Sequence, residues 1–172
     1  TTTGSAQPVI YHEGTGLLTI LGGTLTAEGA GAPCIRKQST GGLTISGGLL
    51  TSNKSNVIMA KGSGTGITIS DGTLTAKGLS AAVEHTGSGY AITMSGGTLI
   101  HQNAASTAQA VRMTADADFI MTGGTISVPS TSATQVITVA KKGTVSINGY
   151  PIHRVDDDLK TYGIDGKADD SV

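Results

Sequence analysis

The sequence predicts an all-β fold, a right-handed parallel β-helix (β-solenoid) of about six coils of ~25 residues, with three short strands per coil. Three observations support this. A triplet similar to Leu-Thr-Ile recurs six times, at steps of 25, 24, 25, 27 and 26 residues. Apolar and polar residues alternate within the triplets, and a pair of turn-forming residues follows each one. The triplets begin at Leu18, Leu43, Ile67, Ile92, Phe119 and Val145.

The triplet is the first strand of each coil. Side chains alternate between the two faces of a strand, so Leu18 and Ile20 are expected to point inward and Thr19 outward. The same alternation recurs in later copies. We therefore expect a row of outward threonines at Thr19, Thr44, Thr68 and Thr93.

A corner and a second strand follow the triplet. Pairs such as Gly47-Gly48 allow positive φ angles and a close approach between coils. Asp71 and Asn148 replace one glycine in two corners, and these residue types tolerate positive φ better than others. The second strand buries one position per coil, namely Leu25, Leu50, Leu74, Leu99 and Ile126.

The third strand is the least regular part of the repeat. We align Cys34 with apolar residues of the other coils, at Val9, Met59, Val83, Val111 and Ile137. Cys34 is the only cysteine, so no internal disulfide can form. Because its column is apolar, we expect a small buried side chain rather than a reactive thiol.

The chain divides into a solenoid over residues 1–149, whose first coil is incomplete, and a C-terminal part over residues 150–172. The second part is acidic and irregular, and two interpretations stay open, a cap on the solenoid or a linker. The start in mid-pattern, the low charge and the Gly/Thr/Ser-rich repeats favour one module of a longer polypeptide, secreted or displayed on a bacterial cell surface.

The composition argues against several functions. A net charge of −1 provides no overall field for nucleic acid, and no apolar run is long enough for direct membrane insertion. The few carboxylates of the coils do not share columns, and the four histidines fall in different phases of the repeat. We therefore predict no enzymatic activity, no catalytic residue, no metal site and no cofactor. Asp165 to Asp170 resembles only part of a calcium loop.

A row of basic residues is the best candidate binding site. Arg36, Lys61 and His85 lie two residues after the Cys34 column, and Arg112 is displaced from it by one. Stacked like charges repel, so an anionic polysaccharide would neutralise them, with help from Tyr11 and a second tyrosine, Tyr90. The competing interpretation is that these residues only keep a corner soluble.

The outward threonines of the second strand form another pattern. Thr24, Thr26, Thr73 and Thr75 build a lattice that resembles the flat face of ice-binding solenoids, although Leu49 and Ile100 interrupt it. Threonine is also a common outward strand residue, which explains the rows without any ligand.

The motifs LTISGG (43–48), ITISDGTLTA (67–76) and ITMSGGTL (92–99) resemble repeats of secreted or surface β-helix proteins of anaerobic and gut bacteria. These proteins include a carbohydrate-binding family whose fold is like that of polysaccharide lyases but which lacks lyase activity. The resemblance implies an extracellular protein whose partner is a polysaccharide or a host or cell-surface glycan. Members of that family hold Ca²⁺ with acidic coil residues, which this sequence does not supply.

The expected function is thus a non-catalytic extracellular carbohydrate-binding or adhesion module for an anionic polysaccharide. The alternative is a structural spacer or stalk of a larger bacterial surface protein. An ice-binding face and a polysaccharide lyase are less favoured. Aromatic residues make up only 3% of the chain, which argues against stacking on neutral sugars.

Overall fold

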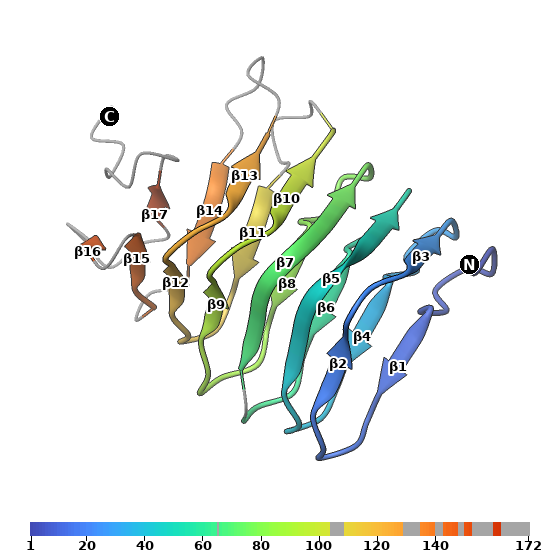
Figure 1. Ribbon diagram of the computed structural model, residues 1–172, viewed down its shortest axis with the longest axis horizontal. Coiled ribbons are helices and arrows are strands. Elements are labelled where there is room, and N and C mark those ends of the chain that lie inside the picture. Colours follow the sequence, from blue (N-terminus) through green and yellow to red (C-terminus); the bar gives the residue numbers. More distant parts are fainter. Residues whose placement is uncertain are drawn as a thin grey trace.

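The computed structural model describes residues 1–64, 66–103, 109–128, 135–139, 143–147, 150–152 and 160–162. Within these residues the protein is all-β and contains no helix. Parallel strands stack into a β-solenoid of about 5 turns, with the N-terminal coil at one end (Figure 1). The predicted fold class is therefore confirmed, with slightly fewer turns than expected.

One sheet holds a single strand from each coil. It is formed, in spatial order, by β1 (Ile10–His12), β4 (Ile35–Lys37), β6 (Ile58–Ala60), β8 (Val83–His85), β11 (Gln109–Met113), β14 (Gln135–Val139) and β17 (Lys160–Tyr162). We call it the single-strand sheet. It contains the predicted third strands of the coils.

The other sheet holds the predicted first and second strands. Its members are β2 (Leu18–Ile20), β3 (Thr24–Ala27), β5 (Leu43–Ser52), β7 (Ile67–Ala76), β9 (Ile92–Met94), β10 (Thr98–His101), β12 (Phe119–Met121), β13 (Thr125–Ser127), β15 (Val145–Ile147) and β16 (Tyr150–Ile152). In two central coils the first and second strands are continuous, because β5 and β7 each run through the corner as one strand. Their pairing contains an irregularity at Ser46.

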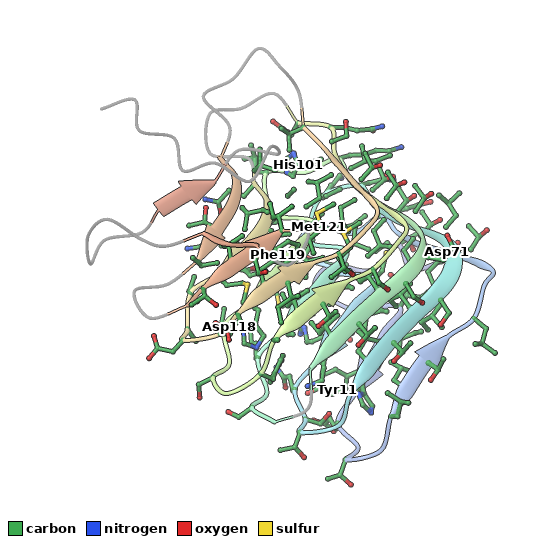
Figure 2. All side chains as sticks on the ribbon, turned by 60° about the vertical axis from the view of Figure 1, so that its left-hand side comes forward. Tyr11, Asp71, His101, Asp118, Phe119 and Met121 are labelled. Carbon is green, nitrogen blue, oxygen red and sulfur yellow. The ribbon has the colours of Figure 1, made fainter. Side chains whose placement is uncertain are left out.

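The register of the first strands agrees residue for residue with the sequence prediction. Leu18 pairs with Leu43, Leu43 with Ile67, and the series continues to Val145. The second strands also follow the predicted register, with Leu50 between Leu25 and Leu74. The apolar columns meet in one hydrophobic core between the sheets, and the buried Phe119 is the largest side chain of its column (Figure 2).

The corner glycines serve two different purposes. A Cβ atom on Gly47 would lie 2.6 Å from the carbonyl oxygen of Leu21 in the preceding coil, so the first glycine permits close backbone approach. The second glycine, Gly48, has a φ of 98°. Asp71 occupies a first-glycine position, so the expectation that it needs positive φ is wrong. Its carboxylate instead accepts a hydrogen bond of 2.7 Å from the N–H of Gly72. Asn148 lies outside the described residues.

The third strands follow a different register from the predicted one. Ile35 pairs with Ile58, and Ile58 pairs with Val83, so Met59 belongs to the neighbouring, outward column. Cys34 precedes Ile35 and is fully buried, in agreement with the expected buried thiol. The misalignment arises because the corners, not the strands, absorb differences in coil length.

Two antiparallel strands close the C-terminal end of the solenoid. β16 pairs with β15, and β17 pairs with β14, so both sheets gain an antiparallel edge there. Antiparallel edge strands satisfy backbone groups that a last parallel coil would leave open. This antiparallel pairing is consistent with a cap. The division of the chain at residue 149 stays a prediction.

Substitution of Ile69 tests the stacked core. Ile69 is fully buried, so Ile69→Asp places an unpaired carboxylate among the apolar columns and should unfold the central coils. Circular dichroism at 37 °C should show loss of the β signal. Thr68→Asp, one residue away on the exposed face, serves as the control and should change the unfolding midpoint little. Equal stability of the two variants would contradict the assigned faces of β7.

Candidate functional site

The outward row of the single-strand sheet does not consist of basic residues alone. Pairing places Tyr11 beside Arg36, Arg36 beside Met59, Met59 beside Glu84, and Glu84 beside Arg112. The predicted column of Arg36, Lys61 and His85 is therefore wrong, because these residues occupy three different positions across the strands. A shift of one residue in the alignment exchanges the two faces of a strand.

Arg112 has its own counter-charge. Its Nη1 lies 2.9 Å from Oε1 of Glu84 on the neighbouring coil, and this is the one ion pair within the described part of the chain. The side chain of Arg112 is 49% exposed, so the pair adds little stability. Glu84 nevertheless neutralises the charge of Arg112, which the sequence prediction had assigned to ligand binding.

Lys61 is exposed and follows β6 directly. Its backbone N–H donates to the carbonyl of Lys37, which places Lys61 in the row of Gln38, two residues along from the Arg36 row. Lys61 and Gln38 thus continue the outward alternation of their strands. Lys61 is a diagonal neighbour of Arg36 on the same outer face.

His85 lies inside the solenoid and is fully buried. It pairs with Ala60 and Met113, and Ala60 pairs in turn with Lys37, so all four belong to an inward column. The expectation that His85 faces a ligand in solvent is wrong. Burial, and to a smaller extent the nearby charge of Lys37, lower the pKa of His85 to about 4.

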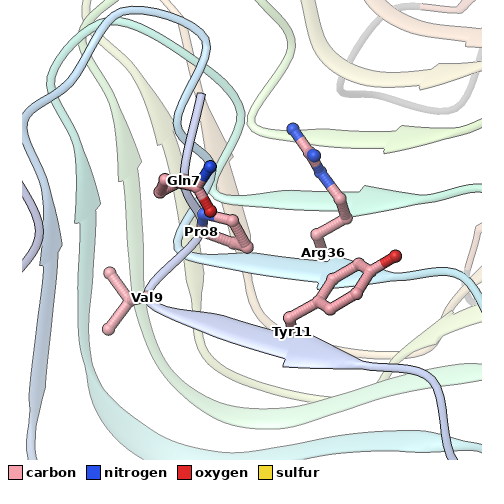
Figure 3. A pocket seen from close by; sticks show the side chains of 5 residues that line it. All are labelled: Gln7, Pro8, Val9, Tyr11 and Arg36. Carbon is pink, nitrogen blue, oxygen red and sulfur yellow. The ribbon is translucent and has the colours of Figure 1, made fainter. Parts of the chain in front are cut away.

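Two of the predicted binding residues do meet. Tyr11 and Arg36 line a pocket of about 220 Å³ together with Gln7, Pro8 and Val9 (Figure 3). The ring of Tyr11 is 49% exposed and lies beside the Arg36 side chain. β1 and β4 supply the floor, and the segment before β1 supplies the wall. The pocket is smaller than the roughly 300–1,000 Å³ of common small-molecule sites.

The pocket presents both hydrogen-bond donors and acceptors. The Nε of Arg36 is buried and has no hydrogen-bond partner within the described residues. The Tyr11 hydroxyl donates to Oε1 of Gln38 at 2.5 Å. Glu13 beside the phenol raises the pKa of Tyr11, which keeps the hydroxyl protonated at neutral pH. The arrangement suits a polar ligand with at least one acceptor atom.

A second group of polar residues, in the interior, was missed by the sequence interpretation. Lys37 is 0% exposed, and its Nζ donates to the carbonyl of Ser39 at 2.7 Å and lies 4.7 Å from the centre of the Tyr90 ring. Tyr90 packs edge-on against His85, with 4.1 Å between ring centres. Tyr90 was expected beside a ligand at the surface, but it is 7% exposed. The sequence did contain a signal for Lys37, because side chains alternate along a strand and Lys37 is two residues after the apolar Ile35.

The remaining candidate groups form no metal or nucleophile site among the described residues. A surface pocket of about 330 Å³ is lined by Gly89–Ala91 and Asp116–Asp118, but Oδ1 of Asp118 already accepts two hydrogen bonds from Thr144. No cluster of three His, Cys, Asp or Glu residues occurs there or elsewhere in the described ranges. Burial raises the pKa of the Cys34 thiol to about 11. Nor does the described chain contain a helix that could span a membrane.

The buried His85 predicts an acid-sensitive fold. Its pKa is lowered on folding, so the unfolded state takes up the proton first, and stability falls as pH decreases from 6.5 towards 4. The loss should reach about 3 kcal/mol, since 2.5 pKa units correspond to about 3.4 kcal/mol. Urea unfolding between pH 7 and 4 measures it. In His85→Met, which copies Met113 of the next coil, only the shallower dependence from buried His101 should remain. An unchanged profile in this variant would contradict the assignment.

Comparison with known proteins adds no relative to this description. The chain matches no protein-family model, and neither a curated protein nor a solved structure is significantly similar to it. The resemblance to surface β-helix proteins of gut bacteria therefore stays a prediction.

Proposed function

We propose that the protein is a non-catalytic carbohydrate-binding module that holds an anionic sugar unit in the pocket of Tyr11 and Arg36. The observation that carries the proposal is the direct pairing of these two residues on neighbouring strands. Arg36 differs from Arg112 on the same face, because no carboxylate is paired with it within the described residues. An unpaired guanidinium beside an exposed ring is suited to an acidic sugar.

The chemistry of the pocket fits one ring of a polysaccharide rather than a whole oligosaccharide. At about 220 Å³ it has room for a single sugar unit that carries a carboxylate or a sulfate. Arg36 would donate charge-assisted hydrogen bonds to that group, and the exposed face of Tyr11 would pack against the sugar ring. Gln7, which also lines the pocket, has an amide that can accept hydrogen bonds from sugar hydroxyls.

Lys61 extends the positive surface beyond the pocket. It lies one coil further along the solenoid and two residues from the Arg36 row, where the next acidic unit of a polymer could reach it. Exposed charge interactions are screened over about 8 Å at physiological ionic strength. Binding should therefore weaken with salt. An extracellular location, secreted or on a cell surface, and membership of a longer polypeptide belong to the same proposal.

A second candidate function is a rigid spacer that holds other domains away from a cell. It is favoured by the continuous hydrophobic core, which runs through every coil from β2 to β15. Each coil depends on its neighbours in such a stack, which makes the rod stiff without any ligand. The two functions are distinguished by whether the outer face binds a glycan.

Arg36→Gln is the direct test of the binding proposal. The substitution removes the unpaired charge and keeps most of the side-chain length, so affinity for polygalacturonate or a sulfated glycan should fall about tenfold or more. Isothermal titration at low and moderate salt measures the change. Arg112→Gln is the matched control, because it removes the same charge from the same face where Glu84 already pairs with it.

The binding measurements distinguish the two functions. Weaker binding in Arg36→Gln and in Tyr11→Ala, with Arg112→Gln close to the original protein, supports the glycan pocket. Equal losses in Arg36→Gln and Arg112→Gln would indicate non-specific attraction to the face. No binding of any glycan by the unmodified protein would leave the spacer as the better account.

A further inference from the structure

The interior cluster of Lys37, His85 and Tyr90 holds a positive charge without a negative one. Lys37 lies on β4, His85 on β8, and Tyr90 in the corner after β8. Within the described residues the Nζ of Lys37 has no carboxylate within ion-pair distance, and its one hydrogen-bond acceptor is the carbonyl of Ser39. A buried ammonium is strongly unfavourable unless it is paired.

Three other polar atoms of the cluster have no hydrogen-bond partner among the described residues. They are the two ring nitrogens of His85 and the Oη of Tyr90, all of which are buried. Natural proteins leave few such groups, and an internal water or an ion commonly explains them. Lys37 has two further N–H donors, the Tyr90 hydroxyl has one O–H donor and can also accept, and neutral His85 has one N–H donor and one acceptor. The cluster therefore has more donors than acceptors.

The neighbouring residues are consistent with an occupant between these groups. Ala60 separates Lys37 from His85 in the inward column, and its side chain is the shortest there. On the other side of Lys37 the column continues with His12, whose Nδ1 lies 3.4 Å from the hydroxyl of Ser39. No acidic side chain of the described residues faces Lys37 from β1, β6 or β8 along this column. Lys37 and His85 therefore flank the smallest side chain of this column.

We propose that the solenoid interior binds one monatomic anion of the halide class, held by Nζ of Lys37, Oη of Tyr90 and an N–H of His85. An anion accepts all three hydrogen bonds and neutralises the lysine. A water molecule could donate to His85 and Tyr90 and accept from Lys37, but it would leave the buried ammonium charge uncompensated. We propose a monatomic rather than a polyatomic anion because only the small side chain of Ala60 separates Lys37 from His85 in the column.

Bromide provides the structural test. Crystals grown in sodium bromide should show an anomalous peak inside the coils, within hydrogen-bond distance of Lys37 and Tyr90. The peak should be absent from Lys37→Met. Lys61→Met removes an exposed lysine one coil away and is the matched control, in which the peak should remain. A non-anomalous peak that occupies the position in the original protein would identify a water and overturn the proposal.

Thermal unfolding provides the test in solution. At constant ionic strength, replacement of gluconate by chloride should raise the unfolding midpoint by about 5 °C with saturation, because the anion binds the folded state. The pKa of His85 measured by NMR should rise with chloride, since an anion favours the protonated ring. Arg36→Gln should keep both effects, which separates this site from the glycan pocket.

Tyr90→Phe keeps the test open if Lys37→Met does not fold. It removes one donor and preserves the ring, so the chloride concentration needed for half of the midpoint shift should rise about tenfold. A chloride effect of the same size in the original protein, Tyr90→Phe and Lys61→Met would be a general salt effect and would overturn the proposal. So would a midpoint independent of chloride in the original protein.

Discussion

The in-register stacking of parallel strands is the constraint on which the rest of the structure depends. Neighbouring strands lie about 4.8 Å apart, so each residue of a coil is placed directly over its counterpart in the next coil. Side chains therefore form columns, and the apolar columns merge into one core. At the corners the same spacing leaves no room for Cβ atoms, as the 2.6 Å approach at Gly47 shows. The columns of the core and the glycines of the corners therefore both result from the same spacing between neighbouring coils.

How much of the fold the sequence can predict depends on where the length of a coil varies. On the first strands, the sequence repeat has steps of 25, 24, 25, 27 and 26 residues, and the paired residues of the structure have the same steps. On the single-strand sheet the paired residues Ile10, Ile35, Ile58, Val83, Val111 and Ile137 give steps of 25, 23, 25, 28 and 26. The corners absorb these differences in coil length, and no sequence periodicity indicates at which residues they do so. Relative to the Arg36 row, His85 is therefore displaced by one residue, which inverts its face, and Lys61 by two. The outward positions of Tyr11 and Arg36 could be predicted, because each follows an apolar strand residue, Ile10 or Ile35.

The interior lysine results from a competition between burial and charge. In the sequence Ile35-Arg36-Lys37, a strand with Ile35 inside must also turn Lys37 inside. A slip of one residue would expose Ile35, at about 1.5–3 kcal/mol, and would bury Arg36 instead. Either register buries one cation, and only one of them keeps Ile35 in the apolar column. The hydrophobic column thus determines which cation enters the core, and His85 and Tyr90 are the polar groups that it meets.

Four basic residues on or next to the single-strand sheet consequently have four different environments. Arg112 pairs with Glu84, Lys61 extends into solvent, Arg36 lies beside Tyr11, and Lys37 is enclosed. Exposed ion pairs contribute little to stability. The two binding proposals therefore concern the two cations that lack an ion-pair partner among the described residues and adjoin an aromatic ring. Arg36 faces outward beside a pocket of about 220 Å³, and Lys37 faces inward, where we propose an ion. Because these two residues are consecutive on β4, the register that places Ile35 in the core also places one cation on each face of the strand.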